Sequence, residues 1–382
     1  MPATPLRNRR IVVNIEQIHL KGFKSIANIS LNNAAPFSVF AGANGSGKSN
    51  FADGLSFFGA VIQRGAVQAL RDYGGYAHIH CFRHRAEKAR TASLEIKISI
   101  GEQIHHYFIK LFDMDKSPLI EEKLEVDGKL VFHRKKGQPP AVNNAEGEPE
   151  SLPDYPNNMS ALIIFGRSPI YSLLTNIKVF RFDPFAAKEP DDSTADATAL
   201  DVRGRNVATL LSVLEKDAEI REQILEWVEL LVPGLEKITT EKQRLDGTTV
   251  ITFKEEGLKA RFPAKLISDG TIYALCILTA MMSRSGELGM TIIEEPERGI
   301  HPKAIAQLVT LMREKAQCEH PVFVTTHSES VIRSCQQDEL WLANKIEGKT
   351  QLKHVSALNL DLGELNLDQA WLMNLFDGGL PW

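Results

Sequence analysis

Residues 42–49, GANGSGKS, have the types and spacing that bind a nucleotide phosphate. They match the pattern G-x-x-x-x-G-K-S/T, in which glycines let backbone N–H groups turn toward phosphate oxygens. Apolar residues precede the loop and a helical pattern follows it, so a helix N-terminus would also face the phosphates. The alternative is a glycine-rich turn that binds nothing. We predict an ATP and Mg²⁺ site, in which Lys48 reaches the β- and γ-phosphates and the Ser49 hydroxyl binds the metal. The predicted nucleotide-binding residues of this loop are Gly42, Ala43, Asn44, Gly45, Ser46, Gly47, Lys48, Ser49 and Asn50.

A second stretch, MTIIEEPERGIHP at 290–302, runs from apolar residues directly into two adjacent carboxylates. In P-loop enzymes an acid at the end of a second strand holds the Mg²⁺ shell, and a neighbouring group orients the attacking water. We therefore assign Glu294 to the metal side, together with Ser49, and Glu295 to the general base. Because Glu294 is longer than the usual Asp, we expect it to act through a water of the shell. Pro296 is expected to hold Glu295 in an extended conformation.

Two weaker signals accompany these stretches. In LISDGT, at 266–271, Ser268 is a predicted helix N-cap, and the helix start could form a second phosphate-binding end. This motif contributes Ser268, Asp269, Gly270 and Thr271 to the predicted nucleotide-binding residues; the alternative is an ordinary helix cap. In VFVTTHS, His327 follows a buried strand, where its imidazole could donate to a γ-phosphate oxygen, although such a histidine is usually structural. The predicted catalytic residues are therefore Glu295, His327 and Lys48.

The elements that must position these groups follow a β-α-β order. The sequence predicts a strand before residue 42, a helix after residue 49, a strand ending at Glu294, a helix at about 302–315 and a strand within 321–328. Strands that alternate with helices in this way form a parallel sheet.

The remaining patterns predict what surrounds this sheet. Alternating residues at 11–31, 93–112 and 123–132 indicate an antiparallel sheet layer, and helical periodicity at 206–231 indicates a helical lobe. Residues 133–158, rich in Pro, Asn, Gly and charge, are predicted to be a flexible insertion. The predicted division is 1–132, an N-terminal ATPase lobe; 133–158, the insertion; 159–285, a helical lobe ending in LISDGT; and 286–382, a C-terminal ATPase lobe.

The composition is that of an ordinary globular protein. Of 382 residues, 43% are hydrophobic and 24% are charged, and the formal net charge is −4. A DNA contact would therefore need a local basic patch. No apolar run approaches the roughly 20 residues of a membrane span, and the four cysteines are scattered. We expect a cytoplasmic protein that makes no membrane contact.

Together the motifs resemble those of the ABC-type ATPase heads of SMC, RecF and related AAA-family ATPases, many of which act in bacterial DNA repair or phage defence. IHLKGFKSI resembles the opening strand of these heads, GANGSGKSN their Walker A motif, LISDGT their signature motif, IIEEPERGIHP their Walker B motif and D-loop, and TTHS their switch histidine. The resemblance implies an α/β P-loop NTPase head with a mixed central sheet, an N-terminal antiparallel sheet layer and a helical lobe. It also implies an ATP-dependent homodimer, in which each ATP is held by the Walker A motif of one copy and by Ser268 and Gly270 of the other.

Some residues depart from that pattern. The signature lacks the second glycine of transporter motifs, which argues against a transport-energising subunit, and no Q-loop glutamine can be assigned. His301 stands where transporter D-loops carry Asp, so coupling between the two sites is expected to differ. No long coiled coil separates the halves, and too few residues follow His327 for a nuclease domain, so any nuclease would be a separate effector protein.

The sequence favours an ATPase whose head engagement acts as a switch on DNA or on a partner effector, in repair or antiviral defence. A nucleotide-dependent binding module with little turnover remains an alternative, as does a transport-energising subunit. Basic residues in FRHRAEKAR, at 82–90, and Arg7, Arg9 and Arg10 could track a DNA backbone or form a solvated face. The group His78, His80, Cys81 and His84 matches no standard zinc spacing.

Overall fold

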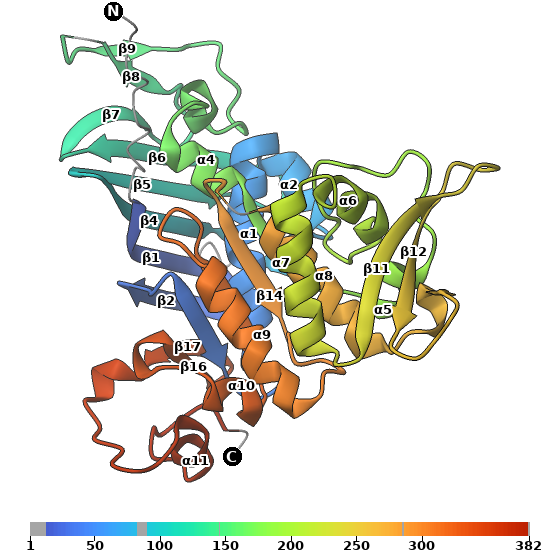
Figure 1. The fold of residues 1–382 in the computed structure, drawn as a ribbon. Coiled ribbons are helices and arrows are strands. Elements are labelled where there is room, and N and C mark those ends of the chain that lie inside the picture. The colour runs from blue at the N-terminus through green and yellow to red at the C-terminus, as the bar shows by residue number, and fades with distance from the viewer. Residues whose placement is uncertain (1–12, 82–89, 145, 285, 381–382) are drawn as a thin grey trace, which may run out of the picture. The chain divides into compact units, whose positions relative to one another are not determined.

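The computed structural model describes residues 13–81, 90–144, 146–284 and 286–380, which form an α/β fold (Figure 1). These residues divide into two compact units. The first unit takes in the described parts of 1–24, 28–34 and 57–175, and the second takes in those of 25–27, 35–56 and 176–382. The predicted fold class is confirmed.

The first unit is built on an eight-stranded sheet in the order β2-β1-β4-β5-β6-β7-β8-β9. Its strands are β1 Val13–Phe23, β2 Ile26–Asn32, β4 Ala92–Ile100, β5 Gln103–Phe112, β6 Leu119–Val126, β7 Lys129–Arg134, β8 Ala141–Asn143 and β9 Pro149–Ser151. Pairing is antiparallel from β1 to β9, as predicted. The alternating stretch at 123–132 belongs to this antiparallel layer as predicted, and it contains a tight turn between β6 and β7, where Asp127 and Gly128 take positive φ values.

Residues 133–158, which the sequence predicts as a flexible insertion, include the end of β7 and the strands β8 and β9. One buried side chain ties this segment to the sheet. Arg134 is 2% exposed and donates to the backbone oxygens of Pro156, Asn157 and Met159 at 3.2, 3.4 and 2.9 Å. Proline and charge in a sequence therefore do not exclude an ordered segment when a buried guanidinium binds its carbonyl groups. The predicted domain boundaries themselves stay a prediction.

The carboxylate of Glu122 lies beside Arg134, at 3.8 Å from its Nη1. Glu122 is 1% exposed and accepts hydrogen bonds from the Ala161 N–H at 2.7 Å, the Ser160 hydroxyl at 2.7 Å and the Tyr107 hydroxyl at 3.0 Å. Burial raises the pKa of Glu122 and lowers the pKa of Arg134, and each partly offsets the shift of the other. Residues 156–161 are thus held by a buried charge pair and its bonds.

The second unit is built on a six-stranded sheet in the order β10-β14-β15-β3-β16-β17. Its strands are β3 Phe37–Ala41, β10 Ile177–Phe180, β14 Met290–Glu294, β15 Val322–Thr326, β16 Leu340–Ile346 and β17 Lys349–His354. Pairing is parallel from β10 to β16, and only β17 is antiparallel, so the sheet is mixed. All residues of β3 and β15 are buried, as expected for parallel strands covered on both faces.

The helices of the chain belong to both units. They are α1 Lys48–Arg64, α2 Ala66–Asp72, α3 Tyr76–Ile79, α4 Pro169–Thr175, α5 Pro184–Lys188, α6 Val207–Leu214, α7 Ala218–Leu231, α8 Asp269–Ser283, α9 Pro302–Lys315, α10 Glu329–Arg333 and α11 Leu367–Leu372. The helices α7, α8 and α9 pack against one another (Figure 1). Residues 271–282 of α8 are all buried, which makes α8 the central helix of the core.

The region predicted as a helical lobe contains both helices and a small sheet. The helical periodicity at 206–231 is divided between two helices, because the Asp217 side chain accepts bonds from the N–H groups of Glu219 and Ile220 and so starts α7 anew. The lobe also carries a three-stranded antiparallel sheet of β11 Leu235–Lys242, β12 Thr249–Glu255 and β13 Phe262–Pro263.

Replacing Arg134 with Met should lower the free energy of unfolding of the first unit by about 3 kcal/mol, because the Glu122 charge would stay buried without its partner. Urea unfolding measures the change. The matched control is Lys136→Met, which removes an exposed cation and its 2.9 Å ion pair with Asp113, and should cost less than about 1 kcal/mol. Equal effects of the two variants would contradict the buried role of Arg134.

Candidate functional site

The phosphate loop lies between the end of β3 and the first residue of α1. Gly45 and Gly47 have φ values of 80° and 103°, a region that glycine enters without steric cost. The Lys48 ammonium donates to the backbone oxygens of Gly42 and Ala43 at 2.7 and 3.0 Å. Burial lowers the pKa of Lys48, while Glu295, Glu297 and Glu294 partly counter that shift. The predicted lysine therefore lies within the loop, close to the two predicted acids Glu294 and Glu295 and to a third acid, Glu297.

Side chains from distant parts of the sequence brace this loop. The Thr350 hydroxyl donates to the Ser46 backbone oxygen at 2.9 Å and lies 2.6 Å from the Ser25 hydroxyl. The Asn50 amide donates to that same Ser25 hydroxyl at 2.7 Å. A Cβ atom on Gly47 would lie 1.9 Å from the Thr350 hydroxyl oxygen, so only glycine fits beside the brace.

The structure brings together the two residues predicted for the metal. The Ser49 hydroxyl donates to Glu294 Oε2 at 3.0 Å. Arg181, just after β10, donates to Glu294 Oε1 and to Asp53 Oδ1, both at 2.6 Å. Burial lowers the pKa of Arg181, but its bonds to the two carboxylates outweigh burial and raise it above its ordinary value. A hydroxyl and two carboxylates form an oxygen donor set of the kind Mg²⁺ takes, so these residues fit the ion.

The candidate base Glu295 does not take the extended conformation predicted from Pro296. Its φ is +50°, in the left-handed region that non-glycine residues rarely adopt. Tertiary hydrogen bonds override the local preference: the Glu295 N–H donates to the Thr325 oxygen at 2.8 Å, and the Tyr273 hydroxyl donates to the Glu295 oxygen at 3.1 Å. The conformational prediction is therefore wrong, although the strand does end at Glu294 as expected.

The predicted switch histidine lies beside the candidate base. His327 Nδ1 is 3.3 Å from Glu295 Oε1 and 3.8 Å from Glu297 Oε1. Glu297 also accepts the Thr326 hydroxyl at 2.7 Å and the His327 N–H at 3.4 Å, so this third carboxylate fixes the backbone that carries the histidine. His301, which stands where transporter D-loops carry Asp, caps α9: its imidazole accepts the Lys303 N–H at 3.3 Å.

The LISDGT motif forms the exposed start of α8. Ser268 is the N-cap, as predicted, and its hydroxyl accepts the Thr271 N–H at 3.0 Å. A Cβ atom on Gly270 would lie 2.1 Å from the Gly299 oxygen, so the motif packs directly on the loop after Glu297. Lys188 binds the Asp269 carboxylate and the Ile267 oxygen. Among the described residues, no hydrogen bond or ion pair joins 268–271 to 42–50 of the same chain.

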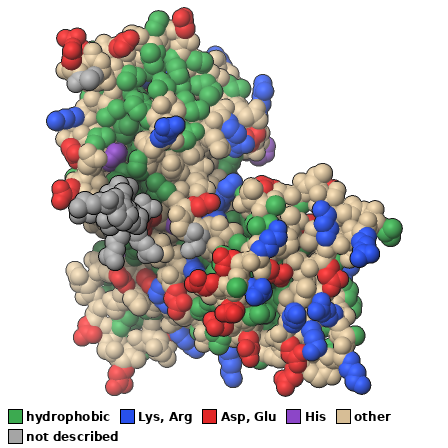
Figure 2. Space-filling view, turned by 45° about the horizontal axis from the view of Figure 1, so that its top comes forward, with side chains coloured by type: hydrophobic (Ala, Val, Ile, Leu, Met, Phe, Trp, Pro, Cys, Tyr) green, Lys and Arg blue, Asp and Glu red, His purple; other side chains and the backbone are tan. Residues whose placement is uncertain are grey.

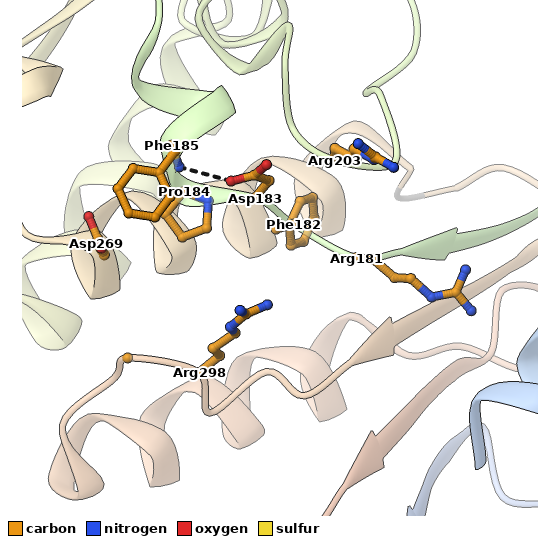
Figure 3. A pocket seen from close by; sticks show the side chains of 9 residues that line it. Arg181, Phe182, Asp183, Pro184, Phe185, Arg203, Asp269 and Arg298 are labelled. Atoms are coloured by element: carbon orange, nitrogen blue, oxygen red, sulfur yellow. Dashed lines mark hydrogen bonds between the residues drawn. The ribbon is translucent and has the colours of Figure 1, made fainter. Parts of the chain in front are cut away.

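A pocket of about 480 Å³ opens beside this motif (Figure 3). Asp269 and Phe185 lie on one side of it, and Arg203 and Arg181 on the other, while Arg298 points toward its interior (Figure 3). Phe185 is 74% exposed, which is unusual for a side chain of its size. In the part of the chain that the structure describes, the guanidinium groups of Arg203 and Arg298 form no ion pair. The pocket therefore offers two available cations next to the motif.

Sequence reasoning missed four residues at the site: Asp53, Arg181, Tyr273 and Thr350. Asp53 lies four residues after Ser49, on the same face of a helix, and that spacing could have revealed it. Arg181 follows a short apolar strand, but the sequence does not show that this strand, β10, pairs with β14 and so places Arg181 beside Glu294. Nothing in the sequence marks Thr350 or Tyr273.

The remaining predictions concern the histidine and cysteine group, the basic segments and membrane-spanning helices. No group of three or more metal-ligating side chains that could hold a metal ion occurs among the described residues, which include His78, His80 and Cys81 but not His84. Arg7, Arg9, Arg10 and residues 82–89 of the candidate basic segment also lie outside the described residues. None of the described helices is both long and apolar enough to cross a bilayer.

A family model matches residues 37–333, a range that contains every predicted site residue. The family is described as "AAA domain, putative AbiEii toxin, Type IV TA system". The chain is 42% identical over 60 residues to the chromosome partition protein Smc of Methanococcus voltae, a match that covers 16% of this chain and 5% of that protein. It is 30% identical over 157 residues to a "Putative ABC transporter ATP-binding protein" of Methanocaldococcus jannaschii, covering 39% of this chain and 52% of that one. The chain thus spans at most about half the length of these relatives.

Two solved structures share the fold. One is an Smc head bound to the C-terminal winged-helix domain of ScpA, with a TM-score of 0.56 and 14% identity, covering 91% of this chain and 100% of that one. The other is an Smc head with an extended coiled coil, bound to the C-terminal domain of ScpA derived from Pyrococcus furiosus. Its TM-score is 0.51 at 15% identity, and the match covers 96% of this chain and 99% of that one.

Replacing Thr350 with Val should weaken ATP binding about five-fold, since the phosphate loop would lose a bond worth about 1 kcal/mol. Equilibrium titration with a fluorescent ATP analogue measures the dissociation constant. The control is Thr252→Val on β12, which removes a comparable hydroxyl bond to the Thr239 oxygen, at 3.3 Å, and should leave ATP affinity unchanged. Unaltered affinity in Thr350→Val would show that the brace does not shape the loop.

Proposed function

Because the chain belongs to the family of AAA domains described as "putative AbiEii toxin, Type IV TA system", and is an SMC- and ABC-like P-loop ATPase, we propose that it hydrolyses ATP to ADP and phosphate. The observation that carries this proposal is the convergence of the predicted groups at one place. The Ser49 hydroxyl donates to Glu294 Oε2 at 3.0 Å, and His327 Nδ1 lies 3.3 Å from Glu295 Oε1. Lys48 lies in the loop beside them.

Each of these side chains has a role in the proposed reaction. Mg²⁺, held by Ser49 and Glu294, would offset the negative charge of the phosphates. Glu295 accepts the proton of the attacking water and directs that water toward the γ-phosphorus. Lys48 offsets the charge that develops on the phosphate oxygens, and His327 donates to a γ-phosphate oxygen. The fixed backbone around Glu297 keeps the imidazole beside the base.

We propose further that a second copy of the chain completes each site. Two observations support this dimer. Ser268 and Asp269 of the motif are exposed, and among the described residues no hydrogen bond or ion pair joins 268–271 to the phosphate loop of the same chain. The neighbouring pocket offers Arg203 and Arg298 without ion pairs, which suits an anionic nucleotide held by another copy. Residues 268–271 would then contact the nucleotide of the second copy, and dimerisation would depend on ATP.

The dimer would act as a switch on DNA or on an effector protein such as a nuclease, in repair or antiviral defence. The family description names a toxin of a toxin–antitoxin system, and the two Smc heads are bound to domains of ScpA, which supports a head that acts through another macromolecule. Basic and acidic side chains are interspersed on the face drawn in Figure 2, in keeping with the small net charge. We place this activity in the cytoplasm.

Replacing Glu295 with Gln should lower ATP turnover about 100-fold or more, because the amide cannot accept the proton of water. ATP would still bind, so the variant should accumulate as a dimer. Phosphate release and light scattering in saturating ATP and Mg²⁺ measure the two effects. Glu256→Gln, at an exposed turn, is the control. Turnover at the wild-type rate in Glu295→Gln would refute the role of Glu295, and a wild-type chain that binds ATP without releasing phosphate would be a binding module instead.

Replacing Arg298 with Glu should weaken ATP-dependent dimerisation about ten-fold or more while each copy still binds ATP, since the reversed charge would repel the nucleotide of the second copy. Sedimentation across a concentration series gives the dimer dissociation constant. Arg244→Glu, on the exposed turn between β11 and β12, makes the same charge change at a residue that does not line the pocket. Equal dimerisation of the two variants would exclude the pocket from the interface.

A further inference from the structure

The Tyr273 side chain links the central helix to the two acids that end β14. Tyr273 lies in α8, two residues after Thr271, and is 1% exposed. Its hydroxyl donates to the backbone oxygens of both Glu294 and Glu295, at 3.0 and 3.1 Å. Burial raises the pKa of Tyr273, so the hydroxyl keeps the proton that it donates. The ring packs edge-on against Phe182, with 5.8 Å between ring centroids.

These two oxygens belong to the peptide groups on either side of the Glu295 Cα atom. The Glu294 carbonyl is part of the peptide group before that atom, and the Glu295 carbonyl is part of the one after it. A single O–H shared between them therefore restrains both φ and ψ of Glu295. Restraint matters here, because φ is +50° and the next residue is Pro296, a combination that the local sequence does not favour.

Other bonds between described residues hold the same backbone, but none of these joins both peptide groups. The Glu295 N–H donates to the Thr325 oxygen at 2.8 Å, and the Arg298 N–H donates to the Glu295 oxygen at 3.1 Å. The first extends the parallel ladder and the second closes a turn. The Tyr273 hydroxyl is the group that fixes the orientation of one peptide group relative to the other, and with it the direction of the Glu295 Cα–Cβ bond.

We propose that Tyr273 is a positioning residue for ATP hydrolysis, whose hydroxyl aims the Glu295 carboxylate at the attacking water by holding the backbone of that residue. This inference rests on the proposed function, in which Glu295 is the general base. The Tyr273 side chain is buried, and its hydroxyl binds backbone oxygens rather than a carboxylate of the site. Its contribution is to the geometry of the reacting groups, where small displacements cost much of the rate.

The test is Tyr273→Phe in the full chain, which keeps the ring and its contact with Phe182 but removes the hydroxyl. We expect kcat to fall about ten-fold, which corresponds to about 1.4 kcal/mol, while the KM for ATP and the ATP-dependent dimer stay within about two-fold of wild type. The matched control is Tyr155→Phe in the first unit, which also removes a tyrosine hydroxyl bonded to a backbone oxygen, that of Ser160, at 2.7 Å.

Wild-type kcat in Tyr273→Phe would overturn the inference. So would a parallel loss of kcat, ATP binding and thermal stability beyond that of Tyr155→Phe, because that pattern describes a residue needed only for the fold. The double variant Tyr273→Phe with Glu295→Gln gives a second measurement: its residual turnover should equal that of Glu295→Gln alone, and a further ten-fold loss would show that Tyr273 acts elsewhere. Wild-type turnover in Glu295→Gln alone would instead refute the proposed function.

Discussion

The parallel pairing of β3, β14 and β15 determines where every candidate catalytic group lies. Glu294 pairs with Thr325, and Thr325 pairs with Phe40, so the carboxyl ends of the three strands reach the same edge of the sheet. The phosphate loop, the two acids and the histidine each follow one of these ends. Because β3, β15 and residues 290–293 of β14 are buried, a shift in their register would move apolar side chains out of the core. The core therefore enforces the alignment that the chemistry needs.

Two cationic side chains balance the carboxylates at this edge of the sheet. Glu294, Glu295 and Glu297 would repel one another if they were left alone near a buried sheet. Lys48 lies close to all three, and Arg181 binds Glu294 and Asp53. These cations offset the mutual repulsion of the carboxylates beside the phosphate loop. Since Ser49 and Arg181 bind the two oxygens of Glu294, a metal ion at Glu294 would have to share that carboxylate with them.

The sequence alone predicted the motifs and the sheet that carries them, because these depend on local spacing and on β-α-β order. It predicted the cap at Ser268 for the same reason. Local spacing does not reveal contacts between groups that are distant in the sequence. The conformation of Glu295, which was predicted wrongly, depends on Thr325 and Tyr273, and the attachment of residues 156–159 to β7 depends on Arg134. The break between α6 and α7 can be predicted from the sequence, because Asp217 is a recognisable helix N-cap inside a continuous apolar pattern.

The brace of the phosphate loop limits which fragments of the chain are suitable for measuring nucleotide binding. Ser25 and Thr350 both lie outside residues 37–333, the range that defines the family. A fragment cut to that range would retain the whole G-x-x-x-x-G-K-S motif but would lose both hydroxyl groups that hold it, and also the outer strands β16 and β17. A fragment with boundaries taken from family similarity would therefore contain the complete motif without the hydroxyl bonds that support its loop. Weak nucleotide binding by such a fragment would not show that the intact chain binds weakly.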